Sequence, residues 1–281
     1  MIPQSFEYTA AKTLDEALGL IGKGAKPLAG GMSLIPMMKL RLSAPEHLVD
    51  LGRISELAQI REEQGAIHVG AMATHHTVES SPIIRGKCPL LGETVSAIGD
   101  VQVRNMGTIG GSIAHADPAA DYPAALQALE ARIVTSKSRT IAASAFFLDT
   151  FSTALEEGEI ILKVIVPVED SGAGTSYQKM PHPASGFAII GVAARIRKSG
   201  GKITMARIGV TGLANKSYRA TMTENLLEGK AGTDIEIQAA ASVVVEGADA
   251  NSDLHASADY RRHLAKVYAE RAIRAALART A

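Results

Sequence analysis

The sequence predicts an α+β fold, because strand-like and helix-like patterns occupy separate stretches of the chain. Three stretches between residues 176 and 210 alternate like antiparallel strands, and residues 198–201 predict a turn between two of them. From Thr221 onward the pattern is helical, and residues 257–279 predict one amphipathic helix. Strands combined with segregated helices are typical of α+β layers.

The length of 281 residues allows two or three domains with a sizeable core. We predict three segments, at residues 1–53, 54–170 and 171–281. In the first segment, Thr13 and Glu16 predict a capping box for a helix over residues 14–21, which Gly22 and Gly24 end. The other elements expected there are strands at 6–8, 26–29 and 47–51 and a helical turn at 37–40.

The second and third segments each show their own order of elements. The second is expected to contain strands at 67–70, 132–135 and 159–166, the last ended by Pro167, and helices at 88–98 and 118–129. The third is expected to open with a linker at 171–174 and to continue with strands at 176–180, 187–196 and 202–210. The apolar stripe predicted on its last helix consists of Tyr260, Leu264, Val267, Tyr268, Ile273 and Leu277.

Composition excludes several classes of function. Lys+Arg and Asp+Glu both number 29, so no net charge favours nucleic acid or an anionic membrane. We find no signal peptide and no apolar run long enough for a membrane span. The single cysteine, Cys88, cannot form an intrachain disulfide or hold an iron–sulfur cluster, and we expect it to be buried. The eight histidines show no metal-ligand spacing, so we predict no metal site.

Two glycine pairs far apart in the chain are the most informative motif. Gly30-Gly31 and Gly110-Gly111 each lie in a small-residue stretch that we expect to be a loop, and Ser33 or Ser112 follows. Glycine backbone can approach a ligand closely, and consecutive N–H groups form a concavity that holds anions. Two such loops can hold a diphosphate from both sides. Either pair alone is more typical of a structural turn than of a ligand site.

With these motifs, the whole chain resembles the FAD-binding medium subunit of the molybdenum hydroxylases, the family of aerobic carbon monoxide dehydrogenase and xanthine dehydrogenase. The resemblance rests on residues 29–36, 104–112, 117–121, 177–179 and 259–264. It implies a two-part FAD-binding domain of the vanillyl-alcohol-oxidase (PCMH-like) type, followed by a domain of antiparallel sheet and helical bundle. Met32 and Gly186 depart from relatives that carry histidine and aspartate there, which bears on the fine contacts to the flavin.

The resemblance also implies which residues bind FAD, without a covalent bond. The first FAD loop consists of Pro27, Leu28, Ala29, Gly30, Gly31, Met32, Ser33 and Leu34, and the second of Thr108, Ile109, Gly110, Gly111 and Ser112. Asp121 matches an acidic position near the adenosine. Ile98 and Leu162 match apolar positions near the flavin ring, Tyr177 an aromatic close to it, and Lys179 a neighbouring basic position.

Several of these residues have a structural alternative. Asp121 is also consistent with a solvated carboxylate in the first turn of a helix, and Tyr177 and Lys179 with one face of a sheet. We expect other polar residues to be structural: Asp117 to cap the helix near Pro118, His75 and His76 to cap or pack, and Arg104 to form a salt bridge. For His115, packing and a cofactor contact remain equal alternatives.

The functional hypothesis is an oxidoreductase subunit that transfers electrons through FAD. We assign no catalytic residue. The resemblance implies two partners: a large subunit with the molybdenum cofactor and a small subunit with two [2Fe–2S] clusters, assembled as a dimer of heterotrimers in the cytoplasm. Two alternatives remain, a stand-alone FAD-dependent reductase of the same fold and a flavin-free scaffold subunit. The substrate stays open, because it would bind on another chain.

Overall fold

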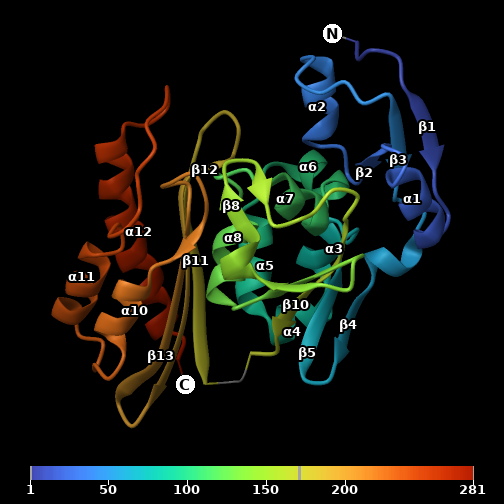
Figure 1. Cartoon of the computed structure of the whole chain (residues 1–281). Helices are drawn as coiled ribbons and strands as arrows, with labels where there is room; N and C mark the ends of the chain where they lie inside the picture. Colours follow the sequence, from blue (N-terminus) through green and yellow to red (C-terminus); the bar gives the residue numbers. More distant parts are fainter. Residues whose placement is uncertain (1, 170–171, 281) are drawn as a thin grey trace.

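The computed structural model describes residues 2–169 and 172–280, which form three larger sheets, one two-stranded sheet and the surrounding helices. The first segment lies at one end of the molecule, the C-terminal sheet and its helices lie at the other, and the second segment lies between them (Figure 1). Three main clusters of buried apolar side chains accompany these parts; one joins the first segment to Met72 and Ile160 of the second, and another joins the second segment to Tyr177 and Ala193 of the third sheet. The described residues therefore form α+β layers, as predicted.

The first sheet is parallel and small. It has the order β1-β3-β2, with β1 at Glu7–Ala10, β2 at Lys26–Leu28 and β3 at His47–Asp50. Helix α1 (Leu14–Ile21) has the predicted bounds, and the Thr13 hydroxyl accepts the N–H of Glu16. The Glu16 carboxylate accepts the N–H of Lys12 at 2.8 Å, so only half of the predicted capping box forms. Helix α2 (Leu34–Lys39) follows β2.

The second sheet is antiparallel, in the order β4-β5-β10-β6-β7. Its strands are β4 (Ile60–Glu63), β5 (Ala66–Gly70), β6 (Arg132–Thr135), β7 (Thr140–Ala142) and β10 (Ile161–Pro167). The helical elements around it are η1 (Ser55–Ala58), α3 (His75–Ser80), α4 (Pro82–Lys87), α5 (Pro89–Ser96), α6 (Val101–Met106), α7 (Ile109–His115), α8 (Tyr122–Ala128) and α9 (Ala143–Phe146). A small hairpin of β8 (Phe147–Asp149) and β9 (Ser152–Thr153) completes the segment.

The third sheet is antiparallel, in the order β11-β12-β13-β14. Its strands are β11 (Ala173–Pro181), β12 (Ala188–Ser199), β13 (Lys202–Thr211) and β14 (Tyr218–Arg219). The predicted turn between β12 and β13 contains Gly200 and Gly201, both with positive φ. Of the predicted linker, Ser171 lies outside the described residues. Ala173 and Gly174 already belong to β11, so that part of the prediction is wrong.

Helices from two parts of the chain cover the two faces of the third sheet. Helix α12 (Ala258–Leu277) lies against β11 and β12, with α10 (Thr221–Leu227) and α11 (Asp234–Ser242) beside it. Helix α8 of the second segment packs on the opposite face, against β12 and β13 (Figure 1). A Cβ added at Gly209 of β13 would lie 1.9 Å from the carbonyl oxygen of Ala124, so only glycine allows this approach.

The stripe predicted on α12 is partly wrong. Leu264 and Ile273 are buried as expected, but Tyr260 is 43% exposed and Val267 is half-buried. Small residues instead fill most of the buried face, which consists of Arg261, Leu264, Ala265, Ala269, Ala272, Ile273 and Ala276. The helix lies so close to β11 that a Cβ at Gly174 would come within 2.0 Å of the Ala276 carbonyl oxygen. Close packing therefore selects alanine where a hydrophobic stripe predicts larger side chains.

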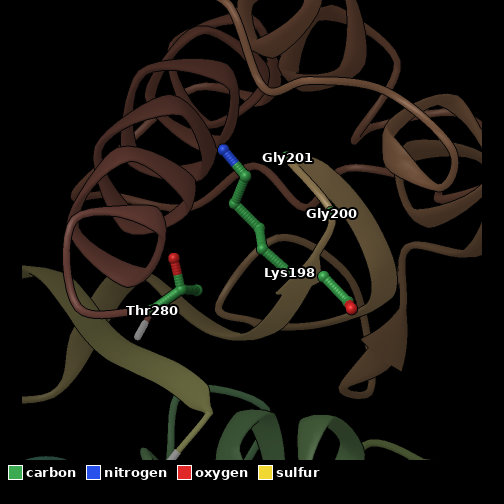
Figure 2. Close-up of a pocket in the computed structure, with 5 residues that line it drawn as sticks. Lys198, Gly200, Gly201 and Thr280 are labelled. Atoms are coloured by element: carbon green, nitrogen blue, oxygen red, sulfur yellow. The ribbon is translucent and has the colours of Figure 1, made fainter.

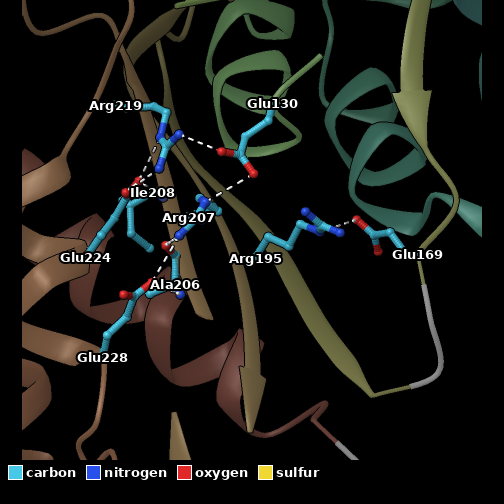
Figure 3. A network of polar contacts seen from close by, with 9 residues as sticks. All are labelled: Glu130, Glu169, Arg195, Ala206, Arg207, Ile208, Arg219, Glu224 and Glu228. Atoms are coloured by element: carbon cyan, nitrogen blue, oxygen red, sulfur yellow. Dashed lines mark hydrogen bonds and ion pairs between the residues drawn. The ribbon is translucent and has the colours of Figure 1, made fainter. Parts of the chain in front are cut away.

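An ion-pair network joins the second segment to the third sheet (Figure 3). The carboxylate of Glu130, just after α8, lies 3.1 Å from the Arg207 guanidinium and 2.8 Å from that of Arg219. Arg207 also pairs with Glu228 at 3.0 Å, and Arg219 pairs with Glu224. Burial raises the pKa of Glu130, but the two arginines outweigh it, so the pKa lies below its ordinary value.

Candidate functional site

The first glycine motif lies between β2 and α2, where the chain turns. Gly31 has a φ of +71°, a conformation that favours glycine. A Cβ added at Gly30 would lie 2.0 Å from the carbonyl oxygen of Met106. The hydroxyl of Ser33 does not cap α2. Within the described part of the chain, the N–H groups of residues 30–33 donate no hydrogen bond to protein atoms. This segment therefore presents consecutive unused donors.

The second glycine motif is the first turn of α7, so the prediction of a loop there is wrong. Thr108 is the N-cap, and its hydroxyl accepts the N–H of Gly111 at 3.1 Å, which starts the helix at Ile109. Gly110 donates its N–H to the carbonyl of Ala71 at 2.8 Å. A Cβ at Gly110 would lie 2.6 Å from the Cβ of Ala71, so this glycine seats the helix on the chain after β5.

The two motifs lie against each other. A Cβ added at Gly111 would lie 3.3 Å from the Cβ of Ala29, and one at Gly30 would lie 2.7 Å from the Cα of Gly107. The two segments thus meet closely at Gly30 and Gly111, beside the unused N–H groups of residues 30–33. A narrow, donor-rich cradle with glycines at its closest approaches fits a diphosphate.

The two apolar positions assigned to the flavin ring come from different elements. Ile98 follows α5 and is half-buried at the edge of the second segment's core. Leu162 lies on β10 and is also half-buried, and its carbonyl accepts the N–H of Ala71 at 2.9 Å. The Ala71 carbonyl in turn accepts the N–H of Gly110, so hydrogen bonds through Ala71 connect Leu162 to the second glycine motif.

The polar residues Asp121, Tyr177 and Lys179 form one buried cluster. The Tyr177 hydroxyl donates to Asp121 Oδ1 at 2.6 Å, and Lys179 Nζ donates to Asp121 Oδ2 at 2.9 Å. Asp121 is only 4% exposed, so the alternative of a solvated carboxylate is wrong. Burial raises the pKa of Asp121, while the Lys179 charge and the hydrogen bonds oppose that shift. Burial, followed by the charge of Asp121, raises the pKa of Tyr177 well above its ordinary value.

Other polar residues near the motifs act structurally. The Asp117 carboxylate accepts the N–H of Ala119 at 2.8 Å, whereas α8 begins only at Tyr122. The predicted cap is therefore wrong, and Asp117 forms a local turn. His75 is buried, with Nδ1 at 3.3 Å from the Tyr122 hydroxyl. Burial, followed by the charge of Arg104, lowers the pKa of His75 to about 4, so its ring is neutral.

Two further expectations concern Arg104 and His115. The Arg104 guanidinium lies 3.1 Å from the Glu79 carboxylate, which confirms the predicted salt bridge. His115 packs on Phe151 with ring centroids 4.8 Å apart, which favours its packing alternative. Met32, at the position where the resemblance implies histidine, is 39% exposed.

Sequence reasoning missed the backbone groups of the site. The Ala71 carbonyl accepts the N–H of Gly110, the Ala97 carbonyl accepts a hydrogen bond from Lys179, and the Met106 carbonyl faces Gly30. A pattern of side chains does not indicate which backbone carbonyl a residue will meet. Among the described residues, no group of three or more His, Cys, Asp or Glu side chains could hold a metal ion. Nor does any described helix combine the length and apolar character of a membrane span.

Family models cover nearly all of the chain. The FAD binding domain in molybdopterin dehydrogenase matches residues 4–169, and the CO dehydrogenase flavoprotein C-terminal domain matches residues 175–276. The chain therefore belongs to the FAD-binding flavoprotein family of the molybdopterin dehydrogenases. This confirms the family resemblance, the FAD cofactor and the fold class predicted from the sequence.

Relatives within this family define the type of subunit. The carbon monoxide dehydrogenase medium chain of Hydrogenophaga pseudoflava is 44% identical, with 100% of both chains covered. The glyceraldehyde dehydrogenase medium chain of Sulfolobus acidocaldarius is 38% identical, covering 98% of this chain and 99% of the relative. The solved H. pseudoflava carbon monoxide dehydrogenase superposes with a TM-score of 0.97 over 100% of both chains. The chain is thus a medium, FAD-binding subunit of a multi-subunit molybdenum oxidoreductase.

Proposed function

We propose that the chain transfers electrons from the [2Fe–2S] clusters of a small partner subunit to a terminal acceptor. The observation that carries the proposal is the contact of the two glycine motifs beside unused N–H groups, which suits the FAD diphosphate. When bound, FAD supplies the redox chemistry, and the protein positions it. We assign no nucleophile or general base to this chain.

The proposed FAD-binding residues fall into two groups. The glycine cradle consists of Pro27, Leu28, Ala29, Gly30, Gly31, Met32, Ser33, Leu34, Thr108, Ile109, Gly110, Gly111 and Ser112. The flanking group consists of Ile98, Asp121, Leu162, Tyr177 and Lys179. The cradle is supported by the missing Cβ atoms and the unused donors. Two hydrogen-bonded connections support the flanking group. Ala71 bonds both to Leu162 and to Gly110 of the cradle, and the Ala97 carbonyl, next to Ile98, accepts from Lys179 of the third sheet.

The proposed assembly contains three kinds of chain. A large subunit carries the molybdenum cofactor, a small subunit carries the [2Fe–2S] clusters, and two such heterotrimers pair in the cytoplasm. Within this chain we propose three domains, at residues 1–53, 54–170 and 171–281, and each of these ranges contains one of the three larger sheets. The family membership of full-length relatives named as medium chains supports partner subunits over a stand-alone reductase.

The decisive experiment offers substrates to the isolated full chain. The chain is loaded with FAD and given aldehydes, carbon monoxide, purines or N-heterocycles with an artificial dye. We expect dye reduction only after the molybdenum and iron–sulfur chains are added. Substrate-dependent reduction by the isolated chain would contradict the subunit function and favour the stand-alone reductase.

A second measurement addresses the cofactor itself. We expect the purified chain to show a flavin spectrum and to release all flavin on denaturation, because no residue is assigned to a covalent link. A chain that takes up no FAD would favour the scaffold alternative. Flavin that stays with the denatured polypeptide would overturn non-covalent binding.

A further inference from the structure

The turn at residues 97–99, just after α5, is held by two cationic side chains. Lys179 Nζ donates to the carbonyl of Ala97 at 2.8 Å. The Arg104 guanidinium donates to the carbonyl of Ile98 at 3.0 Å and reaches that of Gly99 at 3.5 Å. Three successive carbonyls of one short turn therefore face cations. An ordinary surface turn leaves such carbonyls to water, so this turn is unusually constrained.

Lys179 reaches the turn from the third sheet. Its side chain is 6% exposed, and its ammonium lies between the Ala97 carbonyl and the Asp121 carboxylate. The Tyr177 hydroxyl holds Asp121 from the other side. Space for that phenol comes from Gly191 on β12, where a Cβ would lie 2.3 Å from the Tyr177 oxygen. The ammonium is thus neutralised, and its position is determined by buried partners.

Two further contacts fix the turn. Arg104 lies on α6 and is itself held by Glu79 at 3.1 Å, so its guanidinium is oriented independently of Lys179. Gly186, in the β11–β12 hairpin, has a φ of +72°, and a Cβ there would lie 3.3 Å from the Cα of Gly99. Both the second segment and the third sheet therefore set the place of Ile98.

We propose that Lys179 is a positioning residue, which with Arg104 fixes the 97–99 turn so that Ile98 forms an apolar wall for the flavin ring. The inference rests on the proposed FAD site. In this assignment Lys179 and Asp121, besides the FAD-binding role proposed above, also act on the cofactor through the Ala97 carbonyl and the turn. The C-terminal sheet thereby controls the flavin environment without supplying the diphosphate cradle.

The test compares two lysines of the same sheet. In K179M/D121N the buried pair is replaced by two uncharged side chains, so no single buried charge remains. The matched control is Lys198→Met, because Lys198 Nζ also donates to one backbone carbonyl, that of Ala231, at 2.8 Å. Lys198 lines a surface pocket with Gly200, Gly201 and Thr280, near the end of α12 (Figure 2).

Three readouts are made on the full chain with added FAD. They are the FAD dissociation constant from flavin fluorescence, the visible circular dichroism of bound flavin, and amide exchange of residues 97–99 without FAD. For K179M/D121N we expect about tenfold weaker FAD binding, an altered flavin dichroism and faster exchange. For Lys198→Met we expect all three to match the parent.

The outcomes separate this inference from the proposed function. A parent chain that binds no FAD would remove the proposed function itself. A parent that binds FAD while K179M/D121N matches it in affinity, dichroism and exchange would overturn only the positioning role. If the double variant does not fold, Lys179→Arg carries the test: it keeps the charge, but its planar fork cannot place one nitrogen between both acceptors. An unchanged flavin dichroism in that variant would likewise overturn the inference.

Discussion

The second segment packs against each of its two neighbours through a glycine that faces a backbone carbonyl, but the two contacts differ in their surroundings. On one side Gly30 seats the first segment on the Met106 carbonyl. On the other side Gly209 seats the third sheet on the Ala124 carbonyl. The Gly209 contact is closed: Gly209 pairs across the sheet with Arg219, which belongs to the Glu130 ion-pair network (Figure 3). The Gly30 contact leaves backbone donors unused. A glycine facing a carbonyl therefore indicates close packing, and the unused donors distinguish the contact that we propose as the ligand site.

The largest expected effect is at the closed contact. In Gly209→Val the side chain would overlap the Ala124 carbonyl, and we expect the free energy of unfolding to fall by about 3 kcal/mol or more. Urea unfolding of the variant measures this loss. As a control, Gly86→Ala changes a glycine of α4 that has no positive φ and whose Cβ would meet nothing within 4 Å. A Gly209→Val chain as stable as the parent would show that α8 and β13 can separate freely.

The open contact should respond in ligand affinity rather than in folding. Gly111→Asp places a carboxylate in the first turn of α7, which suits the helix dipole but opposes a diphosphate. We expect FAD binding to weaken by about a hundredfold, or about 2.7 kcal/mol, with the far-ultraviolet dichroism unchanged. Gly111→Ala, which adds the Cβ alone, separates charge from bulk. Equal FAD affinity in parent and Gly111→Asp would mean that the second motif does not face the diphosphate.

Acid should weaken the fold next to the open contact. His75 lies under Gly107, and burial lowers its pKa to about 4, against about 6.5 in the unfolded chain. Between these values the unfolded chain binds the extra proton, so stability falls as pH falls. From pH 7 to pH 5 we expect His75 to account for a loss of about 2 kcal/mol. Urea unfolding at both pH values should show a smaller loss in His75→Gln, and an identical loss would refute the assignment.

The smallest effect is expected from the charges of the closed contact. The Glu130 side chain is 45% exposed, so its two ion pairs are screened by solvent. We expect Glu130→Gln to cost about 1 kcal/mol of unfolding free energy, less at high salt, with FAD affinity unchanged. Thermal unfolding at two salt concentrations measures it. A cost of several kcal/mol, independent of salt, would show that charge rather than packing holds this contact.

Local sequence patterns predicted most regular elements well. Helix α1 has the predicted bounds because Thr13 caps it, and β6 has them because its β-branched residues Ile133, Val134 and Thr135 favour a strand. The second glycine motif was predicted as a loop because glycine-rich stretches usually are. The stretch forms a helix instead, because the Thr108 hydroxyl accepts the N–H of Gly111 and the Ala71 carbonyl accepts the N–H of Gly110. Such long-range backbone contacts leave no periodic signal in the sequence.

The candidate site was likewise predicted only in part from the sequence. The cradle glycines could be selected from the sequence because two similar motifs occur in one chain. The resemblance singled out Asp121, Tyr177 and Lys179 but not their mutual bonds, since Asp121, just before α8, meets the residues of β11 only after the third sheet packs. Gly209 was not selected at all. A glycine in a strand looks alike whether it faces solvent or a carbonyl, and only the distance to Ala124 distinguishes the two.

The central place of β10 in the second sheet has a consequence for the order of events during synthesis. Strand β10 pairs with both β5 and β6, and Leu162 holds Ala71, on which Gly110 rests. The ribosome makes β10 after both glycine motifs. At roughly 5–20 residues per second, the nascent chain spends on the order of several seconds with both motifs made and their support missing. Cofactor loading therefore has to wait for residues near Pro167 to leave the exit tunnel, and FAD added to ribosome-bound chains should be retained only beyond that length.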